Sequence, residues 1–167
     1  ELALLNSGTI QDRVEQFIRL NRFKGADSAE IRFLTNSGGK RLDEALRVLS
    51  ARQKIIQYNK ENGIFIHWEY LQKASDEILS ILTDFHRDFP LKSGLIMEEL
   101  RSKTVGAQNQ RLFIFIINKL IQDGAVIREN ELLRLKGHKV TLAGNQKKIR
   151  RDIEDIYLKG ATQPPYF

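Results

Sequence analysis

The chain has 167 residues, enough for one ordinary domain or two small ones, and a content of 41% hydrophobic and 29% charged residues excludes a disordered or fibrous protein. Its longest apolar run, Leu112–Ile117, is far short of the ~20 residues that span a bilayer. It has no cysteine, which excludes disulfides, thiolate metal sites and cysteine nucleophiles. We therefore expect a soluble protein of the reducing cytoplasm.

Positive charge is concentrated at the two ends of the chain. The net charge of +6 divides into +3 over residues 1–67 (11 basic against 8 acidic), −1 over residues 68–135 (9 against 10) and +4 over residues 136–167 (7 against 3). Basic segments attract anionic partners because Lys and Arg neutralise phosphates. A balance of this size is compatible with contact to RNA.

Residues 1–68 show the element order of a first small unit. Thr9 and Asp12 have the spacing of a capping box, and the apolar residues after them follow the helical period. Polar and glycine-containing turns separate the later elements. We expect helices after Thr9, from Ser28 to Leu34 with Ser28 as N-cap, and from about Lys40 to Arg52, then strands at Lys54–Asn59 and Ile64–His67.

Residues 69–140 repeat this order. A long amphipathic helix comes first, and Pro90 ends it. Gly124 is placed to stop a later helix at its C-terminus. We expect helices at about Tyr70–Phe89, Ile96–Ser102 and Gln110–Asp123, then a hairpin of Ala125–Arg128 and Leu132–Leu135.

Three helices followed by a β-hairpin is the order of a winged-helix unit. The predicted fold class is therefore mostly α with small β-hairpins (α+β), as tandem winged-helix units at residues 1–68 and 69–140. Residues 141–167 are expected to form a linker helix, which docks on the second unit or leads onward, and the start of a further winged helix. Units of about 60 to 65 residues are marginally stable alone, so we expect the two to pack together. Glu1 is not an initiator methionine, and we expect a piece of a longer protein.

The segment Phe85–Arg101 resembles a hallmark of the selenocysteine-specific translation elongation factor, in the C-terminal winged-helix region of that family. The hallmark is a helix ending in Tyr/Phe-His, a Pro-Leu-x-x-Gly turn and a Glu-Leu-Arg helix, which here are Phe85-His86, Pro90 to Gly94 and Glu99 to Arg101. Leu135–Val140 is similar to the family's Gly-His connector. Thr162–Pro165 is similar to its Thr-Pro-Pro segment before a third unit, with Gln163 as an interruption. The resemblance covers roughly the second half of the chain, and the first unit matches mainly in element order.

The resemblance implies a role in co-translational selenocysteine incorporation. The family joins a GTPase that carries selenocysteinyl-tRNA to winged helices that reach the mRNA insertion hairpin. This chain is then expected to be a spacer between those parts, with non-specific contact to RNA or the ribosome. GTP and Mg²⁺ are expected in the GTPase domain and not in this chain. The implied partners are the mRNA hairpin, ribosomal RNA, selenocysteinyl-tRNA and the ribosome, with a monomeric chain and no membrane.

Basic residues in two places are the candidates for phosphate contact, with a plain solvated face as the alternative for each. The denser group has six Lys or Arg within sixteen residues and a histidine among them. The other lies on the third helix of the first unit, which is the recognition helix in a helix-turn-helix. The candidates are Lys136, His138, Lys139, Lys147, Lys148, Arg150 and Arg151, and then Lys40, Arg41 and Arg47.

The helix around Arg111–Asn118 is nearly apolar around its circumference, so we expect it to form core or interface and not to read a groove. Ser37–Arg41 lacks the glycine spacing of a P-loop. The histidines at 67, 86 and 138 lack the spacing of metal ligands, and we expect His86 to hydrogen-bond a carbonyl or to interact with its helix dipole. No catalytic, cofactor or metal residue is predicted, so the chain is not expected to be an enzyme.

The alternative functions are a DNA-binding winged-helix transcriptional regulator and a protein-protein scaffold.

Overall fold

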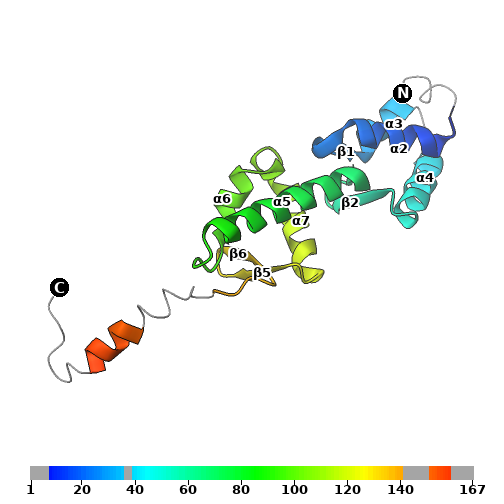
Figure 1. Cartoon of the computed structure of the whole chain (residues 1–167). Coiled ribbons are helices and arrows are strands. Elements are labelled where there is room, and N and C mark those ends of the chain that lie inside the picture. The colour runs from blue at the N-terminus through cyan, green and yellow to red at the C-terminus, as the bar shows by residue number, and fades with distance from the viewer. Residues whose placement is uncertain (1–7, 36–38, 141–150, 159–167) are drawn as a thin grey trace.

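The computed structural model describes residues 8–35, 39–140 and 151–158. These residues form a helix-rich chain with two small antiparallel sheets, one in each unit (Figure 1). The predicted fold class, α+β with small hairpins, is confirmed. Within the described residues, no helix has the length and the apolar character that crossing a bilayer requires.

The described residues of the first unit, 8–35 and 39–67, contain three α-helices and a three-stranded sheet in the order β1-β3-β2. β1 pairs with β3, so that Ala26 lies opposite Phe65. The hairpin of β2 and β3 is the wing. The elements are α2 (Ile10–Leu20), η1 (Arg22–Lys24), β1 (Ala26–Asp27), α3 (Ser28–Thr35), α4 (Gly39–Ala51), β2 (Ile55–Asn59) and β3 (Ile64–His67).

The second unit, residues 68–140, repeats this topology, with a sheet in the order β4-β6-β5. Leu95 of its short first strand lies opposite Leu133 of β6. The sequence predicted neither of the short strands, β1 and β4, because two residues carry no periodicity. The elements are α5 (Trp68–Asp88), β4 (Leu95–Ile96), α6 (Met97–Ser102), η2 (Val105–Ala107), α7 (Gln110–Gln122), β5 (Val126–Glu129) and β6 (Leu132–Leu135).

Polar side chains fix where the helices begin. Thr9 and Asp12 form the predicted capping box at the start of α2. The prediction that Ser28 caps α3 is wrong by one residue, because the Asp27 carboxylate accepts the Glu30 N–H at 2.7 Å. His67 caps α5, since its Nδ1 accepts the Glu69 N–H at 3.3 Å. α5 therefore starts directly after β3, without a linker between the units.

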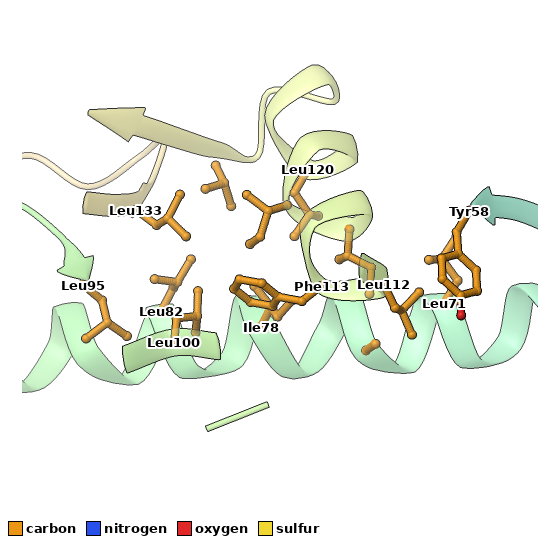
Figure 2. Packing of buried hydrophobic residues seen from close by; sticks show 14 of the residues in the cluster. Tyr58, Leu71, Ile78, Leu82, Leu95, Leu100, Leu112, Phe113, Leu120 and Leu133 are labelled. Carbon is orange, nitrogen blue, oxygen red and sulfur yellow. The ribbon is translucent and has the colours of Figure 1, made fainter. Parts of the chain in front are cut away.

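Each unit has a hydrophobic core, and the second core extends into the first unit. The first core lies between α2, α4 and the sheet, and includes the fully buried Val14, Ile18 and Leu42. The second core is built on α5 and α7, and Tyr58 of β2 also belongs to it (Figure 2). Ile66 of β3 is buried in the same cluster. Apolar packing therefore joins the two units as well as filling each of them, as marginal units of this size require.

A small hydrogen-bond network fastens the junction between the units. The Asn109 side-chain amide donates to the Phe23 carbonyl and to the Tyr58 hydroxyl, at 3.0 Å each. The Tyr58 hydroxyl donates in turn to the Lys24 carbonyl at 3.0 Å. The Phe23 ring meets the Tyr70 ring edge-on, with centroids 5.4 Å apart. The expectation that the two units pack together is thus confirmed.

Residues 151–158 are helical, as the period of Ile149, Ile153 and Ile156 predicts. Every side chain in this range is exposed, and Ile153 and Ile156 are each about half-exposed. The expectation that this helix docks on the second unit is therefore wrong for residues 151–158. The unit boundaries predicted at 68/69 and 140/141 stay predictions.

Candidate nucleic-acid interface

A cavity of about 430 Å³ lies beside the second hairpin, and we call it the wing pocket. Its walls come from the turn after α5, from both hairpin strands and from the connector after β6. Three of its side chains are cationic and one is acidic. The lining residues are Ser93, Ile127, Glu129, Arg134, Lys136, His138, Lys139 and Val140.

The cations of the wing pocket have two different roles. Arg134 pairs with Glu129, with Nη2 2.6 Å from Oε1, and its Nη1 donates to the His138 carbonyl at 3.3 Å. Arg134 therefore supports the wall of the pocket. Lys136 and Lys139 are exposed, and among the described residues neither has an ion-pair partner. These two ammonium groups are thus free to meet an external anion.

Two histidine rings hold the connector on the unit. His86 at the end of α5 stacks on His138, with ring centroids 3.6 Å apart and an interplanar angle of 11°. His86 Nε2 accepts the Leu135 N–H at 3.3 Å, and the bonding pattern assigns the His138 Nε2 proton to the Lys92 carbonyl at 3.0 Å. The prediction that His86 hydrogen-bonds a carbonyl is wrong, because its ring accepts a backbone N–H instead. His86 lies in the last turn of α5, and its interaction with the helix dipole stays a prediction.

The environment of His86 favours the neutral form of its ring. Burial lowers the pKa of His86 from its ordinary value of 6.5, and the neighbouring His138 and Arg134 lower the same pKa further. With Nε2 as acceptor, the ring proton lies on Nδ1, which is buried and has no hydrogen-bond partner in the described part of the chain. The stack is therefore a structural anchor that places His138 and the lysines at the pocket.

The structure brings together only part of the predicted basic cluster. Lys136, His138 and Lys139 meet at the wing pocket. Arg151 lies on the exposed helix of residues 151–158. Lys147, Lys148 and Arg150 lie outside the described residues, so a single patch over residues 136–151 stays a prediction.

The second predicted group lies on α4, with all three side chains exposed. Arg47 forms an ion pair with Glu44, with Nη2 2.8 Å from Oε1, and this bond holds the pKa of Glu44 below its usual range. Lys40 and Arg41 have no ion-pair partner among the residues that the structure places. A phosphate contact on α4 would thus rest on Lys40 and Arg41 more than on Arg47.

The prediction that α7 forms core and interface is confirmed. Leu112, Phe113 and Ile116 are buried, and Phe115 faces the Tyr58 ring of the first unit at a centroid distance of 6.4 Å. The helix is not apolar around its whole circumference, however. An exposed strip remains along it, formed by Arg111, Ile114, Asn118, Lys119 and Gln122.

Sequence reasoning missed five lining residues of the wing pocket, among them the hydrogen-bond donors Ser93 and Arg134. Ser93 lies in the turn after Pro90, and Arg134 lies in a strand, so neither belongs to a basic run. The pairing of β4 with β6 brings the turn and the hairpin together. The one available signal was the resemblance, since the Pro-Leu-x-x-Gly turn and the Gly-His connector are the two segments that meet here.

Comparisons with known proteins agree with this geometry. Residues 79–135 match the family model described as "Elongation factor SelB, winged helix". The selenocysteine-specific elongation factor of Desulfomicrobium baculatum is 30% identical over 164 residues, which are 98% of this chain. They are only 26% of that protein, so the chain spans about a quarter of the length of the relative it matches.

A solved structure shares the fold. The structure of the mRNA-binding domain of elongation factor SelB from E. coli in complex with SECIS RNA aligns with a TM-score of 0.53. The alignment covers 77% of this chain and 98% of that chain at 11% sequence identity, so it supports the fold alone. The resemblance predicted from the sequence is confirmed: residues 79–135 match the SelB winged-helix model, and the chain is similar to part of a selenocysteine-specific elongation factor.

Proposed function

We propose that this chain is a non-catalytic, RNA-contacting arm of a selenocysteine-specific elongation factor. In this role it links the part that carries the tRNA to the units that bind the mRNA hairpin. The observation that carries the proposal is the match to such a factor along 98% of the chain. The matched segment is about a quarter of the length of that factor. The junction network of Asn109, Tyr58 and Phe23 supports it, because an arm that positions other parts must itself hold its shape.

The RNA contact is assigned to the wing pocket. Lys136 and Lys139 offer unpaired charges there, and the Ser93 hydroxyl offers a hydrogen-bond donor. Such groups bind the phosphate backbone and carry no sequence information, which suits a positioning arm. The buried face of α7 disfavours the DNA-binding alternative, since the helix that would enter a major groove is packed against the first unit.

The proposal extends to the whole protein by way of its relative. The GTPase activity, with its GTP and Mg²⁺, belongs to a part of the protein outside these residues. The ribosome, ribosomal RNA and selenocysteinyl-tRNA are further partners, and the protein is a cytoplasmic monomer. The family resemblance supports these statements, and the motif failure at Ser37–Arg41 supports placing the nucleotide elsewhere.

The test is the binding of an RNA hairpin to the chain and to the double variant Lys136→Glu/Lys139→Glu. We expect RNA affinity to fall and the slope of log K against log salt to decrease in magnitude by about 1 for each lysine. Fluorescence anisotropy over a range of salt concentrations measures both. The control is Lys73→Glu/Lys103→Glu, which makes the same charge change at exposed lysines on α5 and after α6.

Three results would contradict the proposal. Equal loss of RNA affinity in the control variant would mean that net charge, and not the wing pocket, determines binding. Tighter binding of duplex DNA than of RNA would favour the transcriptional regulator. Absence of any salt-dependent RNA binding would favour the protein-protein scaffold.

A further inference from the structure

A second cavity, of about 310 Å³, lies between the two units and shares no residue with the wing pocket. We call it the inter-unit pocket. One wall is the end of the first hairpin, with Tyr58, Asn59, Lys60 and Glu61, and the other is α7, with Arg111 and Ile114. The pocket exists only because the two units pack together.

Asn59 is a lining residue of this pocket, and its side-chain amide has an unused hydrogen-bond donor. Its side chain is 8% exposed, and its Oδ1 accepts the Asn62 N–H at 3.2 Å. That bond fixes which end of the amide is oxygen and which is nitrogen. The Nδ2 group is buried and has no hydrogen-bond partner among the described residues. A buried N–H without an acceptor is unfavourable, so the group that suits this position is an acceptor.

The charges at the pocket indicate that the acceptor is an anion. Lys60 and Arg111 are exposed at its rim, and within the described residues neither forms an ion pair. Glu61 is the one acid among the lining residues. A metal cation is disfavoured, because Asn59 offers N–H groups and two cations surround it. Phosphate suits the arrangement, since its several oxygens accept from an amide, an ammonium and a guanidinium together.

The surroundings favour a phosphate that belongs to a nucleic acid chain over a free ion. Tyr58 and Ile114 give the pocket an aromatic and an apolar side, which suits a ribose or a base. A neighbouring cavity of about 430 Å³ continues along α7 and is lined in part by Asn118 and Gln122. Amide side chains of this kind hydrogen-bond base edges that are not already paired. Tyr58 of β2 contacts Phe115 of α7, so this helix is partly covered by the first unit and is not free to enter the groove of a duplex.

We propose that the inter-unit pocket binds a backbone phosphate of single-stranded RNA, with Asn59, Lys60 and Arg111 as donors. The inference deepens the proposed function, on which it rests for the identity of the polymer. Because the donors come from both units, a phosphate bound here also holds the units together. RNA binding and the rigidity of the tandem are therefore coupled through this site.

The test uses the 167-residue chain, with inorganic phosphate and a short single-stranded oligouridylate as the two probes. Two-dimensional NMR follows the side-chain amide of Asn59 and the Nε–H of Arg111. We expect both probes to shift these signals, and oligouridylate to do so at about a tenfold lower concentration.

Two variants test the donors. Asn59→Asp keeps the acceptor for Asn62 and removes the donor, and Arg111→Gln changes an exposed residue without disturbing the core. Each is expected to weaken oligouridylate binding about threefold or more, whereas Lys103→Gln on the same chain leaves it unchanged.

The same titration in the Lys136→Glu/Lys139→Glu variant separates this inference from the proposed function. If Asn59 and Arg111 still shift there, the inter-unit pocket binds RNA independently of the wing pocket. If these signals stay fixed in the unmutated chain while those of Lys136 and Lys139 move, the inference is overturned and the proposed function stands. A response to inorganic phosphate without a response to oligouridylate overturns RNA as the source of the phosphate.

Discussion

His86 connects the end of α5 to the end of the second hairpin through two contacts of one ring. Its Nε2 accepts the Leu135 N–H, and its face stacks on His138. The hydrogen bond requires the neutral ring, because a protonated Nε2 cannot accept. A positive charge on the ring would also be repelled by the nearby Arg134. A single buried imidazole thus supplies two of the contacts that hold the connector on the unit.

This arrangement predicts a loss of stability in weak acid. The pKa of His86 is lowered on folding, so the unfolded chain takes up the proton first as the pH falls. The contribution of His86 is therefore fully present above its ordinary pKa of 6.5 and is lost as the pH falls from there through the lowered pKa. Urea unfolding at about pH 7.5 and about pH 5.5 measures the difference.

The matched variant is His86→Gln, which does not titrate. We expect it to be less stable than the unmutated chain at the higher pH but to lose less stability between the two pH values. An unchanged pH dependence in His86→Gln would show that His86 does not control it.

At the residue scale the sequence predicted part of the wing pocket. Lys136, His138 and Lys139 were found because they are close together in the chain. Ser93 and Arg134 were not, because their proximity depends on a strand pairing between segments about forty residues apart. Asn59 gave no sequence signal either, since its unused donor is a consequence of burial between two units.

α7 shows how one element serves both units. Its N-cap is Asn109, whose Oδ1 accepts the Leu112 N–H at 3.0 Å. The Nδ2 of the same side chain donates across the junction to Phe23 and Tyr58. One amide therefore starts the helix that carries the second core and also fixes the first unit against it.

Asn109→Ala removes both functions and is expected to lower the free energy of unfolding by about 2 to 3 kcal/mol. About 1 kcal/mol of this is the lost cap, and the remainder is the Phe23 carbonyl and Tyr58 hydroxyl left without their donor. Asn109→Asp keeps the oxygen that caps α7 and loses the N–H donor. It is therefore expected to lower the free energy of unfolding only by the contribution of the junction hydrogen bonds. Equilibrium urea unfolding measures both, and equal costs for the two variants would show that the cap contributes nothing.

The sequence predicted the longer elements well because their length gives the helical or strand period several turns to appear. α4, α7 and β3 begin and end within one residue of the expected positions. The start of α5 was placed two residues late, because its cap is His67, which is not a usual N-cap residue. The exposed strip of α7 was missed as well, because only the packing partners show which side of an apolar helix is left open.

At the scale of the whole molecule, the repeated topology and the junction have different origins. Each unit folds by the same order of helices and hairpin, which the sequence shows twice. The contact between them uses side chains that no repeat requires, such as Phe23, Tyr58 and Asn109. The basic residues of the wing pocket and the donors of the inter-unit pocket are held in fixed relation only if this contact is stable.

The tandem is therefore predicted to unfold as one cooperative body. β3 continues directly into α5, and the second core includes Tyr58 and Ile66 of the first unit, so neither unit can lose its packing alone. Trp68, the only tryptophan of the chain, lies at this junction and reports on it by fluorescence. Urea transitions followed by Trp68 fluorescence and by far-UV circular dichroism are expected to coincide, which is the signature of a two-state process. Two separate transitions would mean that the units are independent, and the positions of both pockets would then vary relative to each other.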